Sequence, residues 1–337
     1  MSESNLPDFI AYFLQPDHFD HPVEQVDLIQ THISYVLIAG DFVYKIKKPV
    51  DFGFLNFASL ARRRHFCAQE VLLNRRLCPD IYLDSVAISR TDNGFSLHGD
   101  GEVVEYAVKM KKMPLDGMMP DVIKRGGVDR QTIDRIVDIL VPFYEQAADG
   151  PEIRKFGSAE AVAVNVLENF EQTESFLDQG ALSKEQFATV KAYAQTFLEQ
   201  QDLFAQRARS RVKDCHGDLY SANICLAPDQ VYIFDCIEFN ERFRYCDVAS
   251  DVAFLAMDLD YQGLGELSDY FIKRFIEKSG DDGLQTMLNF YKCYRAYVRG
   301  KIGLFTAHAP EVDDKTADAA RQAAAKYFVL AEKYAGN

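Results

Sequence analysis

The chain has 337 residues, of which 48% are hydrophobic, as is typical of a folded protein with one large domain or two smaller ones. The formal net charge of −14 argues against general nucleic-acid binding, which needs basic patches that meet phosphates. No apolar run approaches the roughly 18 to 20 residues that cross a bilayer, so we expect no membrane partner. The N-terminus lacks a basic region before an apolar stretch, so the sequence predicts a cytoplasmic protein.

Four of the seven cysteines, Cys215, Cys225, Cys236 and Cys246, recur about every ten residues, a spacing that raises a metal site as one alternative. The cysteine count is odd, and no C-x-x-C pair occurs. We therefore interpret the cysteines as small apolar residues in and around buried strands.

The first part of the chain has the pattern of strands around one helix. Two β-rich runs within residues 26–50 are joined at Gly40-Asp41, and the run from Val26 to Gln30 predicts a strand before them. Residues 57–77 have helical periodicity, and Ser59 is placed to cap that helix. Further strands are expected at 81–90 and 103–110.

After Met113-Pro114 the pattern becomes helical, with a β-like interlude at 212–239. The expected helices are 130–149, 158–178, 184–208 and 315–335. We predict an α+β fold of two lobes, a β-rich N-lobe over residues 1–113 and a mainly helical C-lobe over 114–337. A cleft between such parts is a common place for a ligand site.

One stretch, residues 214–247, carries a distinctive pattern of polar residues. It contains His216-Gly217-Asp218, then Asn223, and then Asp235 at the end of the apolar run 231–234. A carboxylate can accept the proton of a hydroxyl, while an amide oxygen and a second carboxylate can hold Mg²⁺ against phosphates. A hairpin with arms 224–226 and 231–234 would bring these groups together.

The order and spacing match the protein-kinase catalytic loop, H-R-D-x-x-x-x-N, and the metal-binding Asp that follows it, with Gly217 in place of Arg. The stretch resembles the aminoglycoside phosphotransferase and choline-kinase-like family, whose motif is H-G-D-x-x-x-x-N. It looks closest to an uncharacterised bacterial branch, some members of which are fused to a P-loop kinase-like domain; no such domain is expected here.

This resemblance implies a protein-kinase-like fold with Asp218 as catalytic base, Asn223 and Asp235 as Mg²⁺ ligands, and His216 as a brace of the loop. It also implies that Asp247 anchors the catalytic loop from a helix start, and Asp247 stands like an N-cap before Val248-Ala249. The alternative is a chance match of three residues in a structural cluster.

Kinases pair a strand lysine, which contacts the α- and β-phosphates, with a helix glutamate. Lys45 and Lys47 share one face of the expected strand 42–48, because side chains alternate along a strand. Glu70 is the only acid between Asp51 and Asp80, so we predict that it pairs with a lysine. We choose Lys45 over Lys47 because its place resembles V-A-I-K; an ion pair of Glu70 with a nearby arginine is the alternative.

The phosphate loop departs from protein kinases, since neither G-x-G-x-x-G nor a Walker A motif occurs. The expected turn 31–34 has no glycine, but its backbone N–H groups and the hydroxyls of Thr31 and Ser34 could reach phosphate. An ordinary hairpin turn is the alternative.

Other charged residues have a structural and a functional interpretation. Glu238, Asp258 and Asp260 could line an acceptor pocket, but we favour a solvated acidic face. Arg295 and Arg299 could bind an anionic substrate, but we favour structural ion pairs.

Together these observations predict a transferase that uses ATP and Mg²⁺ to move the γ-phosphoryl group to a hydroxyl of a small-molecule acceptor. Two other functions stay open, nucleotidyl transfer to a protein and a nucleotide-sensing module on the same fold. The presence of Asp218, Asn223 and Asp235 argues against pure sensing.

Overall fold

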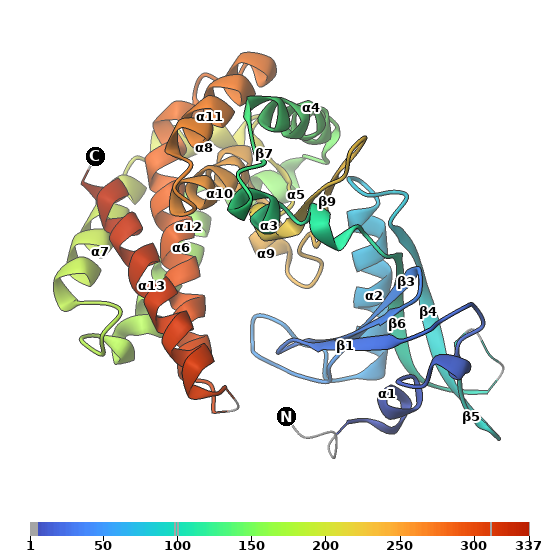
Figure 1. Ribbon diagram of the computed structural model, residues 1–337. Coiled ribbons are helices and arrows are strands. Elements are labelled where there is room, and N and C mark those ends of the chain that lie inside the picture. Colours follow the sequence, from blue (N-terminus) through green and yellow to red (C-terminus); the bar gives the residue numbers. More distant parts are fainter. Residues whose placement is uncertain (1–5, 98, 100, 311, 337) are drawn as a thin grey trace. The chain divides into compact units, whose positions relative to one another are not determined.

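The computed structural model describes residues 6–97, 99, 101–310 and 312–336. Its chain forms two compact units, one made of Met1–Gly117 with Cys225–Glu241, the other of Met118–Ile224 with Arg242–Asn337 (Figure 1). The first unit holds a six-stranded sheet and the second is mainly helical, which confirms the predicted α+β class. The lobe boundary at residue 113 stays a prediction.

The sheet of the first unit is antiparallel throughout, in the order β1-β2-β3-β6-β4-β5. Five strands lie where the sequence predicts them, and the short β5 was not predicted. Their bounds are β1 Val26–Gln30, β2 Ser34–Ala39, β3 Phe42–Lys47, β4 Tyr82–Thr91, β5 Gly94–Leu97 and β6 Glu102–Lys111.

The two faces of β3 have different environments, because its side chains alternate. Tyr44 and Ile46 join the apolar core on one face, together with Ile10 and Phe13 from the N-terminal segment that contains α1 (Asp8–Tyr12). The opposite face of the sheet packs against α2 (Leu60–Asn74). This helix begins after Ser59, whose hydroxyl accepts a hydrogen bond from the Arg62 N–H (3.3 Å), as the sequence predicts.

A two-stranded hairpin, β8 (Ile224–Leu226) and β9 (Val231–Ile233), forms where the sequence predicts one. The residues around its second strand contact the end of α2. The Cys78 thiol donates to the Ile233 carbonyl (3.0 Å), and the Cys236 N–H donates to Asn74 Oδ1 (2.8 Å). These bonds attach the hairpin to the first unit.

The second unit is built around α10, which is buried along almost its whole length and packs against α11 and α12. Helix α12 also packs along α13, where an added Cβ on Gly300 would lie 2.7 Å from the Phe328 ring. The long helices are α4 Arg130–Gln146, α6 Ala159–Thr173, α7 Lys184–Leu198, α8 Gln201–Ala208, α10 Val248–Tyr261, α11 Gly265–Ser279, α12 Leu284–Ala307 and α13 Asp314–Ala335. Shorter elements are α3 Met119–Lys124, α5 Pro151–Arg154, α9 Glu241–Arg244 and the antiparallel pair β7 Val212–Asp214 and β10 Tyr245–Asp247.

The single helix expected over 184–208 is wrong, because the chain breaks into α7 and α8 at Gln200, whose ψ is 57°. Leu198 and Phe204 are both buried. Six residues apart on one continuous helix, they would point about 120° away from each other. The break gives each helix its own buried side. In the part of the chain that the structure describes, no helix has both the length and the apolar character of a bilayer span.

Candidate active site

The predicted catalytic loop follows β7 in the second unit, and its backbone is braced by His216. This side chain is fully buried, and its Nδ1 accepts a hydrogen bond from the Asp218 N–H (3.2 Å). This hydrogen bond supports the bracing role expected for His216, which stays a prediction. Asp218 itself is half-buried.

Two carboxylates of α10 hold the loop at both ends. Asp251 accepts hydrogen bonds from the N–H groups of His216 (2.6 Å) and Gly217 (2.9 Å). Asp258 accepts one from the Ser221 N–H (3.0 Å). Seven residues apart on a helix, the two acids lie on one face. Burial raises the pKa of Asp258.

The sequence analysis missed both of these roles. It expected Asp247 to anchor the loop, but Asp247 instead caps α10 through the Ala249 N–H (2.9 Å) and pairs with buried Arg207 (2.6 Å). Asp247 therefore forms the N-cap that the sequence indicates, and its role as an anchor of the loop stays a prediction. An available signal was the apolar character of 248–259: an acid in such a helix is buried, and a buried carboxylate needs hydrogen-bond donors.

Gly217 adopts a φ of 87°, a left-handed conformation that favours glycine over an L-residue with a Cβ. Its carbonyl accepts a hydrogen bond from Arg295 (3.0 Å), which also lies 3.7 Å from Asp251. The structural interpretation of Arg295 is therefore confirmed. Arg299, one turn further along α12, stacks over the ring of Tyr220 (4.7 Å), a residue of the same loop.

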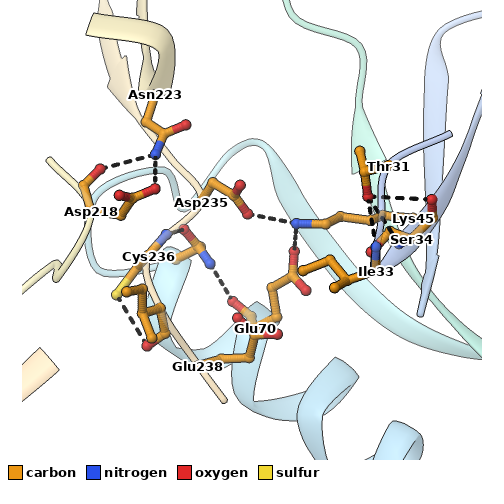
Figure 2. A network of polar contacts seen from close by, with 12 residues as sticks. Thr31, Ile33, Ser34, Lys45, Glu70, Asp218, Asn223, Asp235, Cys236 and Glu238 are labelled. Atoms are coloured by element: carbon orange, nitrogen blue, oxygen red, sulfur yellow. Dashed lines mark hydrogen bonds and ion pairs between the residues drawn. The ribbon is translucent and has the colours of Figure 1, made fainter. Parts of the chain in front are cut away.

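Asn223 is tied to Asp218 by its amide nitrogen, which donates to the Asp218 carbonyl (2.9 Å) and to Oδ2 (3.0 Å). Because the nitrogen is used in this way, the amide oxygen of Asn223 faces away from Asp218 (Figure 2). The arrangement orients a carboxylate and leaves an amide oxygen as a possible metal ligand.

In the first unit, Lys45 lies between two carboxylates. Its Nζ is 2.8 Å from Glu70 Oε1 and 2.5 Å from Asp235 Oδ1 (Figure 2). The predicted ion pair with Glu70 is therefore present. Lys47 binds the other oxygen of Glu70 (2.6 Å), so Glu70 serves both lysines. The two lysines differ in exposure, 17% for Lys45 and 2% for Lys47, which leaves Lys45 as the accessible one.

The ion pairs keep these groups charged. Burial alone would lower the pKa of Lys45, but Asp235 and Glu70 outweigh it and hold that pKa well above its usual range. Burial likewise opposes ionisation of Glu70, yet the two lysines lower its pKa to about 2.

Asp235 has two features of a functional residue. Its φ is 62°, a conformation that is costly for a non-glycine residue and is often found at functional sites. Its side chain is 41% exposed although it is paired with Lys45, so one side of the carboxylate faces outward. Carboxylate and amide oxygens are the ligands that Mg²⁺ prefers, and proteins commonly supply only one or two of them. Asp235, in the first unit, and Asn223, in the second, each carry an oxygen of this kind.

Thr31 and Ser34 lie in the β1–β2 turn, as expected. The Thr31 hydroxyl accepts the Ser34 N–H (2.9 Å) and the Ile33 N–H (3.3 Å), and the Ser34 hydroxyl is buried (Figure 2). In this structure the Thr31 side chain serves the hairpin turn, whereas the buried Ser34 hydroxyl has no hydrogen-bond partner among the described residues. Their contact with phosphate stays a prediction.

The solvated acidic face expected for Glu238, Asp258 and Asp260 is wrong. Glu238 and Asp258 are buried, and Asp260 pairs with Lys292 (2.9 Å). Each acid has a donor that the sequence analysis did not identify. None of the seven cysteines is in a disulfide. Among the described residues no group of three or more His, Cys, Asp or Glu side chains is arranged to hold a metal.

Comparison with solved structures shows the protein-kinase-like fold of small-molecule phosphotransferases, as the motif predicts. An aminoglycoside phosphotransferase in complex with GDP and kanamycin is similar with a TM-score of 0.56 and 15% identity, over 98% of this chain and 99% of the other. A spectinomycin phosphotransferase in complex with ADP and spectinomycin matches with a TM-score of 0.51 and 11% identity, over 97% and 96% of the two chains. A choline/ethanolamine kinase family protein from Mesorhizobium loti matches with a TM-score of 0.50 and 12% identity, over 91% and 92%.

Among curated proteins, uncharacterized proteins of Mycobacterium tuberculosis and Mycobacterium bovis are 31% identical over 308 residues. The match covers 89% of this chain but 59% of the relatives' length, so the chain spans about three-fifths of each relative. No family model matches the sequence.

Proposed function

We propose that the protein is an ATP- and Mg²⁺-dependent phosphotransferase that moves the γ-phosphoryl group to a hydroxyl of a small-molecule acceptor. The observation that carries this proposal is the placement of Lys45 between buried Glu70 and half-exposed Asp235. A strand lysine, a helix glutamate and a carboxylate after a hairpin form the arrangement that kinases use for a metal-bound nucleotide.

In this proposal Lys45 contacts the α- and β-phosphates, and Glu70 orients it. Asn223 and Asp235 would hold Mg²⁺, which, when bound, neutralises charge that develops on the phosphates. The turn with Thr31 and Ser34 would contribute backbone N–H groups to the phosphates. Lys45 lies on β3 and Glu70 on α2, whereas Asp235 lies two residues after the end of β9.

Asp218 is the proposed general base. The Asn223 amide holds Asp218 Oδ2 at 3.0 Å, and the loop that carries Asp218 is fixed by Asp251 and Asp258. A carboxylate held in this way can orient the acceptor hydroxyl and take its proton at one oxygen as the phosphoryl group is transferred.

The first test is nucleotide binding. A ligand at 100 times its Kd stabilises the folded state by about 2.7 kcal/mol. For a chain of this size the melting temperature should rise by roughly 2 °C or more. ATP and GTP are compared, each with and without Mg²⁺, because GDP is bound in one of the similar structures. Absence of any shift at millimolar concentrations would refute the proposal.

Two variants separate the roles. Asp235→Ala should weaken Mg²⁺·ATP binding and turnover together. Asp218→Ala should keep ATP binding, while turnover falls about 10²- to 10⁴-fold, the usual cost of removing a general base. Equal loss of ATP affinity in both variants would contradict these assignments. In a screen of hydroxyl compounds, a product heavier by one phosphate supports phosphotransfer, whereas a protein heavier by one nucleotide indicates nucleotidyl transfer.

A further inference from the structure

Lys47 has no role in the proposed function, yet it is the more deeply buried of the two lysines. Its ammonium contacts Glu70 Oε2 on α2 (2.6 Å) and Glu238 Oε1 in the segment after β9. It also lies over the Phe57 ring (4.8 Å). A lysine buried to this degree is rare unless its charge is compensated, and here two carboxylates compensate it.

The contacts of Lys47 complete an unbroken series of five alternating charges. Asp235 binds Lys45, Lys45 binds Glu70, Glu70 binds Lys47, and Lys47 binds Glu238. Lys45 and Lys47 are two residues apart on one face of β3, while Asp235 and Glu238 are three residues apart in one segment. Strand, helix and segment are therefore held together by alternating charges.

The exposure of the five groups indicates that the two ends of the series have different roles. Asp235 and Lys45 are the exposed end, at 41% and 17%, whereas Glu70, Lys47 and Glu238 are buried, at 0%, 2% and 6%. The buried end cannot touch a nucleotide. It can, however, decide where the exposed end lies, because Glu70 orients Lys45 and Glu238 is in the same short segment as Asp235.

We propose that Lys47 is a positioning residue that clamps Glu70 to Glu238 and thereby holds the Asp235 carboxylate where Mg²⁺ bound to a nucleotide requires it. This inference rests on the proposed function. When Asp235 turns to a metal and Lys45 to phosphates, the Glu70–Lys47–Glu238 clamp keeps its own partners. The segment 235–238 therefore stays attached to α2 and β3 after the exposed ion pair opens.

The clamp makes a prediction about Mg²⁺ that a purely structural role does not. The probe is ADP, which carries the α- and β-phosphates and has no γ-phosphoryl group to transfer, titrated by calorimetry with and without Mg²⁺. Lys47→Met should weaken Mg²⁺·ADP binding by about 10- to 100-fold, the usual effect of losing a residue that orients a metal ligand. Binding of metal-free ADP should change little, because Lys45 keeps Glu70. The control is Lys111→Met, which replaces an exposed lysine of the same sheet. This variant should bind ADP with the wild-type Kd both with and without Mg²⁺.

Glu238→Ala cuts the same clamp from the other side without leaving an uncompensated acid, so it tests the inference even if Lys47→Met does not fold. It should lose the same Mg²⁺-dependent part of the affinity. In the Lys47→Met/Glu238→Ala double variant the losses should not add, because both changes break one connection.

Three results would each overturn the clamp. The first is wild-type Mg²⁺·ADP affinity in Glu238→Ala, and the second is an equal loss of ADP affinity with and without Mg²⁺. The third is a loss of Mg²⁺·ADP affinity in the double variant that equals the sum of the two single losses. A lower melting temperature with unchanged Kd would likewise make Lys47 merely structural. If the wild-type protein binds neither ADP nor Mg²⁺·ADP, the proposed function is refuted and the clamp falls with it. If the wild-type protein binds Mg²⁺·ADP and the variants bind it with the same affinity, the clamp is refuted while the proposed function stands.

Discussion

Replacing Asp251 by asparagine tests how the catalytic loop is held. The two loop N–H groups bind different oxygens of Asp251, His216 N–H binding Oδ2 (2.6 Å) and Gly217 N–H binding Oδ1 (2.9 Å). Asparagine has the same size but only one oxygen. Whichever way the amide is turned, its NH₂ group faces one of the two N–H donors.

The expected cost follows from these contacts. A hydrogen bond to a charged group contributes about 1.5–3 kcal/mol, and one such bond is lost outright. Arg295, 3.7 Å from Asp251, also loses its counter-charge inside the second unit. Breaking a buried ion pair by removing one partner typically costs about 3–5 kcal/mol, so we expect Asp251→Asn to lower the free energy of unfolding by that amount. Domains are stable by about 5–15 kcal/mol, so the variant should remain folded at low temperature.

The matched control is Asp247→Asn at the N-cap of the same helix, α10. Asp247 is paired with buried Arg207 of α8 and contacts neither loop N–H. Urea denaturation should show comparable destabilisation of the two variants. Turnover, measured at a temperature where both are folded, should fall much further in Asp251→Asn, with Mg²⁺·ADP binding preserved. Equal turnover in the two variants, or wild-type stability of Asp251→Asn, would refute the assignment of Asp251 as the loop anchor.

Three further predictions follow from other parts of the structure. Gly217→Ala and Gly280→Ala both place a Cβ at positive φ (87° and 63°) and should each cost about 1–2 kcal/mol in urea unfolding, but only Gly217→Ala should reduce turnover; equal turnover would contradict a role for the loop backbone. Burial lowers the pKa of Lys301 to about 8, so between pH 8 and 10.5 the unfolded chain binds more protons and stability rises with pH. Lys301→Met should remove that rise, and unchanged pH curves would disprove it. Because Gly217 has no side chain to gather an activation-loop phosphate, protein shown by intact mass to be unphosphorylated should be active; activity only after phosphorylation would refute this.

Local patterns in the sequence were sufficient to predict much of the fold and to identify the residues of the proposed nucleotide and metal site. Alternation along 42–48 placed Lys45 and Lys47 on one face of β3, and both contact Glu70. The apolar arms 224–226 and 231–234 predicted the β8–β9 hairpin, and Ser59 predicted the start of α2. These features depend on neighbours within a few residues, which the sequence displays directly.

Long-range partners were decided only by the tertiary structure. Asp251 and Asp258 hold the loop from a helix more than thirty residues away, and Lys47 meets Glu238 across 191 positions. A carboxylate looks the same in the sequence whether it faces water or a buried donor. Its environment arises from packing, which sets burial and brings the compensating charge to it. For this reason the sequence identified the residues proposed to touch nucleotide and metal. The structure was needed to assign partners to Asp251, Asp258, Lys47 and Glu238, which hold the neighbouring backbone and side chains in place.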